Sequence, residues 1–217
     1  MNPYVDKARL LGVSHKIAFF AAMGAGLVLV TVASGFPATV SLAVYASSLA
    51  LMFGVSALYH RPRWSPAARR LMRRVDHSAI WFLIAGTYTP ICVLILGAET
   101  GSRLLVLAWV AAAAGVAKSI FWSDAPKPVT AGLYLLLGWA FVPYLPEVMG
   151  ALGRLDLSLI AAGGLFYTVG AIVYALRTPD PFPAVFGYHE VFHALVVVAS
   201  ACHFVAISRV ALGPHAA

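Results

Sequence analysis

Two histidines four residues apart begin an apolar segment near the end of the chain. Residues 188–204 read YHEVFHALVVVASACHF, so His189 and His193 lie one turn apart on the same face of an expected helix. Two imidazoles at this spacing are a common start for a metal site, and zinc favours nitrogen ligands. Alternatively, both histidines cap the helix start at the level of the lipid headgroups. This segment alone leaves both interpretations open.

A third histidine and an aspartate elsewhere in the chain extend the metal interpretation. With His60, His189 and His193 as ligands, a tetrahedral zinc keeps one position for water, which is the arrangement of catalytic sites. Asp76 could orient that water or act as a general base. Asp76 could also be the N-cap of a helix, because Asp-His-Ser precedes an apolar run, and the two roles are compatible.

The other polar residues near these positions are further candidates. Ser56 lies four residues before His60, where its hydroxyl could bond a ligand or a substrate carbonyl, or simply pack. His15 and His77 are candidates for supporting a ligand or for the membrane interface. His203 follows His189 by fourteen residues, about 21 Å along a helix, so it cannot share that metal and is expected to be a buried, hydrogen-bonded residue. The terminal His215 is expected to be solvated.

The same letters also spell a protease motif. His189-Glu190-Val191-Phe192-His193 matches H-E-x-x-H, in which the glutamate is the general base of a zinc protease. The histidine spacing fits an intramembrane metalloprotease. The third ligand that such enzymes take from a later helix is missing, because no acidic residue follows Glu190.

The composition indicates which elements must position these side chains. Hydrophobic residues make up 61% of the 217 and charged residues 11%, which is typical of a protein that crosses the membrane several times. No polar block is large enough for a soluble domain, so residues 1–217 are expected to form a single transmembrane domain. The surplus of basic residues is interpreted as a topology signal, and no nucleic-acid partner is expected.

Seven apolar segments have about the length that a hydrocarbon core requires. The expected spans are 17–36, 38–59, 78–97, 104–122, 129–149, 157–176 and 189–208. Pro143 and Pro146 should kink or shorten the fifth of them. The sequence therefore predicts an all-α, seven-helix transmembrane bundle.

Basic residues then predict the orientation of the bundle. With the N-terminus in the cytoplasm, twelve Lys and Arg face inside and three face outside, which satisfies the positive-inside rule with the C-terminus outside. The inside residues are Lys7, Arg9, Lys16, Arg61, Arg63, Arg69, Arg70, Arg73, Arg74, Lys118, Lys127 and Arg177, and the outside ones are Arg103, Arg154 and Arg209. This topology brings His60, Asp76 and the pair at the start of the seventh span to the same face of the membrane.

Taken together, the spaced motifs resemble a known family. Ser56-Ala57-Leu58-Tyr59-His60, then Asp76, then His189-x-x-x-His193 on seven spans is similar to the haemolysin III branch of the progestin and adiponectin receptor superfamily. The stretch 86–90 (GTYTP) and the looser Gly12-x-x-His15 belong to the same resemblance, which covers essentially the whole chain.

The resemblance implies a seven-helix fold with a cytoplasmic N-terminus. It also implies zinc held at His60, His189 and His193, with Asp76 reaching the metal through water. Members of the superfamily are associated with ceramidase-like hydrolysis of lipid amides, and bacterial members with membrane lysis or homeostasis. By comparison with the animal receptors, the protein is expected to lack their long N-terminal cytoplasmic domain, and the superfamily does not require a glutamate at position 190.

The resulting leading hypothesis is a multi-pass protein of the cell membrane that acts as a zinc-dependent hydrolase of a lipid amide or ester. Asp76 and Ser56 are the expected catalytic residues, and the lipid would arrive laterally from the bilayer. The alternative is a membrane-perturbing (cytolytic) or homeostatic protein in which zinc is structural. An intramembrane metalloprotease is the third possibility.

Overall fold

The computed structural model describes residues 8–213, so Lys7 and His215 lie outside the described residues. Over this range the protein is all-α, with seven helical spans long and apolar enough to cross a membrane. The helices are α1 (Val13–Thr31), α2 (Phe36–His60), α3 (Pro66–Leu94), α4 (Ala98–Phe121), α5 (Lys127–Gly138), α6 (Leu145–Ala151), α7 (Arg154–Leu176) and α8 (Tyr188–Leu212). The predicted seven-helix membrane fold is confirmed.

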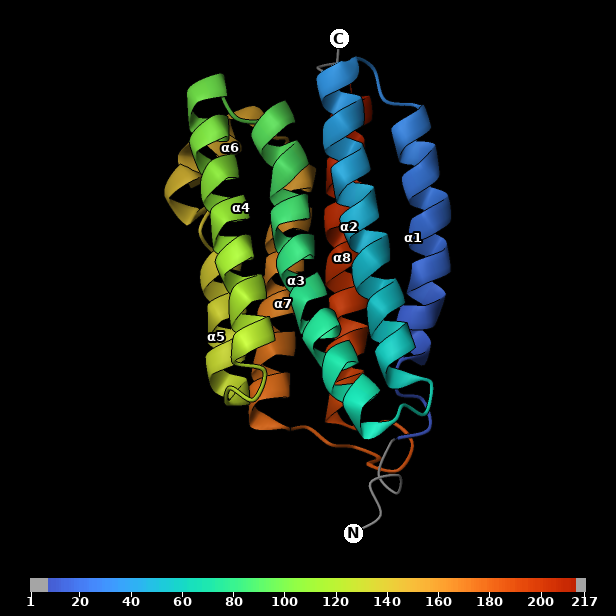
Figure 1. The fold of residues 1–217 in the computed structure, drawn as a ribbon. Helices are drawn as coiled ribbons and strands as arrows, with labels where there is room; N and C mark the ends of the chain where they lie inside the picture. Colours follow the sequence, from blue (N-terminus) through green and yellow to red (C-terminus); the bar gives the residue numbers. More distant parts are fainter. Residues whose placement is uncertain (1–7, 214–217) are drawn as a thin grey trace.

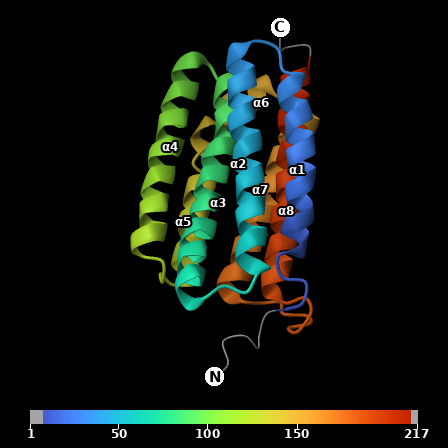
Figure 2. The same cartoon turned by 45° about the vertical axis from the view of Figure 1, so that its right-hand side comes forward.

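The helices stand side by side in a ring that follows the chain order (Figure 1). α8 closes the ring by packing against both α7 and α1. Turning the molecule keeps α4 at one edge and α1 at the other, with α5, α7 and α8 behind α2 and α3 (Figure 2). The start of α8 therefore lies at the same end of the bundle as the end of α2.

The third span begins earlier than the sequence suggested. α3 starts at Pro66 instead of residue 78, because the Ser65 hydroxyl accepts a hydrogen bond from the Ala68 amide (3.3 Å) and proline occupies the first turn. Asp76 is thus an interior residue of α3. The expectation that Asp76 caps this helix is wrong, and its side chain is available to the bundle interior.

The fifth span is interrupted, as its prolines predict. α5 ends at Gly138, a short 3-10 turn covers Val142–Tyr144, and α6 carries the chain onward with Pro146 in its first turn. Proline lacks the amide hydrogen that a continuous helix would need at these positions. The break leaves the middle of the bundle wall less regular next to α7.

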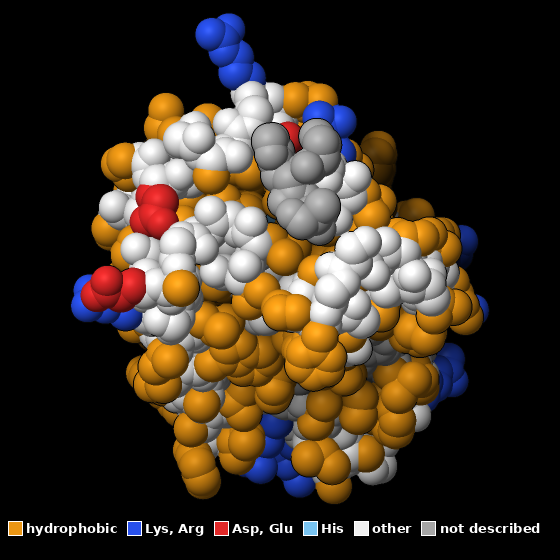
Figure 3. Space-filling view, turned by 90° about the horizontal axis from the view of Figure 1, so that it is seen from above, with side chains coloured by type: hydrophobic (Ala, Val, Ile, Leu, Met, Phe, Trp, Pro, Cys, Tyr) orange, Lys and Arg blue, Asp and Glu red, His pale blue; other side chains and the backbone are white. Residues whose placement is uncertain are grey.

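Large apolar side chains cover the outside of the bundle. Phe36 and Phe121 are 82% and 87% exposed, a pattern that suits contact with lipid tails but not with water. Viewed from the end at which α8 finishes, the surface is largely hydrophobic with a few charged side chains of both signs (Figure 3).

Candidate metal site

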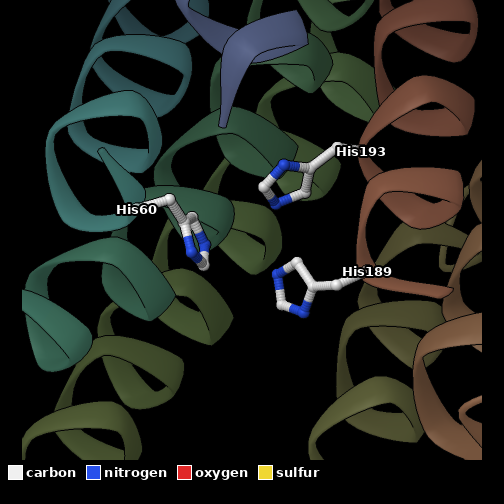
Figure 4. Close-up of side chains that lie close together, drawn as sticks. All are labelled: His60, His189 and His193. Atoms are coloured by element: carbon white, nitrogen blue, oxygen red, sulfur yellow. The ribbon is translucent and has the colours of Figure 1, made fainter. Parts of the chain in front are cut away.

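Three histidines from two helices meet at one end of the bundle. His60 is the last residue of α2, and His189 and His193 occupy the first two turns of α8. Figure 4 shows the His60 ring facing the other two rings across the gap between these helices. The ring centroids are 4.8 Å (His60–His189), 4.9 Å (His60–His193) and 4.7 Å (His189–His193) apart.

The geometry of the three rings fits a metal ion. One nitrogen from each ring lies within 4.8 Å of the others, and a tetrahedral zinc with bonds of about 2.0–2.1 Å would draw them to roughly 3.4 Å. Small ring rotations cover that difference. His193 is 2% exposed, and its buried Nδ1 has no hydrogen-bond partner among the described residues. Because a buried polar atom normally has a partner, an ion is a natural one here. The three histidines could therefore bind a metal ion.

Asp76 lies beside this group, at ion-pair distance from His60. Its Oδ2 lies 3.9 Å from His60 Nε2, and the residue is 9% exposed. This distance is too long for a direct hydrogen bond and is one that a bridging water can span. α3 thus brings the carboxylate to the place where a general base could act on water held beside the histidines.

Ser56 is engaged by a residue to which sequence reasoning gave no firm role. Its Oγ lies 2.8 Å from His15 Nδ1, and the His15 ring stacks on His193 with centroids 3.8 Å apart and planes 15° apart. His15 is 2% exposed. It therefore links α2 to α8 and fixes the plane of a candidate ligand, as supporting residues around metal sites do. Ser56 and His15 both line the cavity described below.

Gly12 allows this arrangement. Its φ of +76° belongs to the left-handed region, and a Cβ added there would come within 2.8 Å of His60 Cβ. Only glycine meets both conditions without strain. The loose Gly12-x-x-His15 pattern was the available sequence signal, since its glycine packs on one histidine and its histidine stacks on another.

Glu190 lies within the same turn of α8 but is used differently. Its Oε2 accepts a hydrogen bond from the Gly187 amide (2.8 Å), which caps the N-terminus of α8, and the residue is 3% exposed. A carboxylate at this position also stabilises the positive end of the helix dipole. This contact directs Glu190 to the backbone of its own helix, which weighs against a role as the general base of a metalloprotease.

The two remaining interior histidines lie elsewhere along the cavity. His203 Nε2 is 3.1 Å from the Ile160 carbonyl and donates to it, in agreement with the expected hydrogen-bonded residue. His77 accepts a bond at its carbonyl from Tyr134 Oη (2.8 Å). Neither residue belongs to the group of three rings.

An elongated, mostly apolar cavity of about 170 Å³ leads away from the histidines. At one end it is lined by Asp76, His189 and His193, and at the other by Phe141, Val148 and His203. On α3 alone its lining runs from Asp76 to Ile91, which is about 22 Å of helix. The cavity is therefore polar at its histidine end and mostly apolar along the rest of its length.

These features define a multi-pass membrane protein with a buried histidine site at one end of seven helices. Residues 4–204 match the family model described as Haemolysin-III related, and the chain belongs to that family.

Its relatives include bacterial and animal proteins. The chain is 31% identical to Hemolysin-3 of Bacillus cereus over 207 residues, which cover 94% of this chain and 91% of that protein. It is 32% identical over 165 residues to a Hemolysin-3 homolog of Bacillus subtilis (strain 168), and the match covers 76% of this chain and 74% of that protein. The human Monocyte to macrophage differentiation factor is 28% identical over 169 residues, covering 76% and 67%.

Proposed function

We propose that the protein is a zinc-dependent hydrolase that cleaves an amide or ester bond of a membrane lipid. The observation that carries the proposal is the continuity of the apolar cavity with His189, His193 and Asp76, which lie beside the third histidine, His60. A structural metal site needs no such cavity beside it, whereas an enzyme acting on a long acyl chain does.

His60, His189 and His193 are the proposed ligands, and the donor set favours zinc among common metals. When bound, zinc would supply a Lewis acid and lower the pKa of its water. Asp76 would hold a water molecule beside His60 and accept its proton, which the distance of 3.9 Å between Asp76 Oδ2 and His60 Nε2 supports. Ser56 faces the same cavity, where its hydroxyl could bond the substrate carbonyl once its bond to His15 is shared.

The apolar walls of the cavity would exclude bulk water and hold the acyl chain. The proposed path for the lipid is lateral, from the bilayer, beside the interrupted fifth span. The excess of basic residues at the end that carries the histidines supports an orientation with this end in the cytoplasm and the end of α8 outside.

A second function is favoured by the name of the relatives. The name Hemolysin-3 refers to the lysis of cells. The competing proposal for this chain is therefore a membrane-perturbing or homeostatic protein in which the metal is structural. The two proposals differ in what they require of Asp76, whose Oδ2 lies 3.9 Å from His60 Nε2 and which is not a proposed metal ligand.

Asp76→Asn separates them. The amide cannot accept a proton, so release of fatty acid from lipid amides and esters should fall by about 10²–10⁴-fold. Zinc content and thermal stability should stay near wild type, because Asp76 is not a proposed ligand. Mass spectrometry of the products formed by the purified protein measures fatty-acid release. The control is Glu99→Gln, because Glu99 is an exposed residue of α4. Unchanged turnover, or lysis that persists with no turnover in wild type, supports the structural-metal proposal.

A further inference from the structure

Three basic residues near the histidines are partly shielded from solvent. Arg73, Lys118 and Lys127, which we call the inner cations, are half-buried, whereas Arg70 and Arg74 on the same stretch of α3 are exposed. Lys118 Nζ donates to Thr130 Oγ1 (2.7 Å), and Lys127 Nζ donates to Tyr188 Oη (2.6 Å).

The inner cations lie near residues that line the histidine end of the cavity, although none of the three cations belongs to the lining itself. Lys127 Nζ lies 4.5 Å from the ring centroid of Tyr174, which lines the cavity. Arg73 is one turn from His77 on α3, and the Tyr134 hydroxyl ties α5 to the His77 carbonyl. His77 and Tyr134 also line the cavity. The positive charges are therefore grouped where a ligand headgroup would lie.

These charges are poorly matched by acidic residues. Among the described residues, Arg73 is the member of the inner cations that forms an ion pair. Its partner is Asp124, whose side chain is 84% exposed. Lys118 and Lys127 bond to hydroxyls and form no ion pair in the part of the chain that the structure describes. Arg73 Nε is buried and lacks an acceptor within that same part. A bound anion would supply the charge partner that the two lysines and Arg73 Nε lack.

Membrane topology alone does not account for this arrangement. The positive-inside rule requires basic residues at this end of the bundle, and exposed arginines such as Arg70 and Arg74 satisfy it. It does not require Lys118 and Lys127 to bond to hydroxyl groups of Thr130 and Tyr188. These contacts need a separate reason.

We propose that the inner cations bind the phosphate of a lipid headgroup whose acyl chain fills the cavity. The proposal rests on the proposed function for the position of the acyl carbonyl beside Asp76. Arg73 is three residues from Asp76, about 4.5 Å along α3, so the phosphate and the carbonyl of one headgroup can reach both. A phosphate has several acceptor oxygens that can take bonds from more than one cation.

The test compares two fluorescent lipids that differ only in the phosphate, a phosphatidic acid and the diacylglycerol with the same chains. Binding to the purified full-length protein in detergent is read by anisotropy. Wild type should bind the phosphatidic acid on the order of tenfold more tightly. The double variant Lys118→Gln, Lys127→Gln should lose most of this preference. Lys118→Arg, Lys127→Arg and the control Arg70→Gln, Arg74→Gln should keep it.

Equal affinity of the wild-type protein for the two lipids would overturn the proposal. This comparison uses wild type alone, so it does not depend on whether the variants fold. Loss of the preference to the same extent in the Arg70, Arg74 control would also overturn it, as would displacement by inorganic phosphate at concentrations similar to the lipid. Binding is read without turnover. A failed preference with intact hydrolysis therefore rejects the phosphate site alone, and a preserved preference without hydrolysis rejects the proposed function alone.

Discussion

The candidate site depends on residues of α1 and α2 that pack against the three histidines. His15 stacks on His193 and bonds Ser56, and Gly12 lets the start of α1 approach His60. Each of these residues restricts a ring that would otherwise rotate freely. A metal site needs such restriction, because ligand orientation affects metal affinity as much as ligand identity.

Gly12→Ala should therefore weaken the site without removing a ligand. Positive φ and the 2.8 Å approach to His60 Cβ together should lower stability by about 1–3 kcal/mol and reduce retained metal. Thermal melting in detergent and metal analysis measure both effects. Gly24→Ala is the matched control, because a Cβ there meets nothing within 4 Å. Similar behaviour of the two variants would show that Gly12 has no special role.

At the residue scale, the sequence predicted the three histidines and Asp76 because their spacing has a chemical meaning. It could not assign His15 or Gly12, because stacking and close approach depend on how α1 packs against α2 and α8. Asp76 looked like a helix cap because the apolar run starts after it, and the polar first turns of α3 hid the true start at Ser65.

At the element scale, α8 is the helix that defines the site. Its first turns carry two candidate ligands, and its N-terminus is capped by Glu190 through the Gly187 amide. The cap holds the first turn in helical form and so keeps His189 and His193 on one face. The H-E-x-x-H letters therefore have a structural explanation that needs no protease.

Glu190→Gln distinguishes these explanations. The glutamine carbonyl can still accept the Gly187 amide hydrogen, so lipid hydrolysis and metal content should stay within about threefold of wild type. A general base replaced by an amide would instead cost about 10²–10⁴-fold. Fatty-acid release assays decide between them, and a loss of that size with metal retained would favour the protease motif.

The spans themselves were the most predictable elements, since twenty apolar residues have few alternatives in a bilayer. Their ends were less predictable. α3 and α8 extend past the apolar runs because helices continue through polar residues until a cap or proline ends them. The break after Gly138 could be predicted from Pro143 and Pro146, because a proline interrupts a helix through its own backbone and needs no tertiary contact.

At the scale of the whole molecule, the ring of helices surrounds a cavity that no single segment reveals. Its lining comes from helices far apart in the sequence, so its length could not be predicted from hydropathy. If the cavity holds the acyl chain of the proposed substrate, we expect a preference for chain length, because the distance from Asp76 to Ile91 would limit that chain.

Ile91→Trp should shorten that cavity. Cleavage of long-chain substrates should fall by roughly tenfold or more, while short-chain substrates and metal content should be little changed. Val93→Trp serves as the control, because Val93 is 38% exposed and does not line the cavity. Product analysis over a series of chain lengths measures the shift, and equal losses at every length would argue against an acyl-chain cavity.

The most direct test of the account is metal analysis of the purified protein beside its His189→Ala and His203→Ala variants. Wild type and His203→Ala should each retain about one zinc ion per chain, and His189→Ala should lose most of it, because three nitrogens fall to two. Equal zinc in all three proteins, or none in wild type after growth with zinc, would contradict a metal centre at His60, His189 and His193.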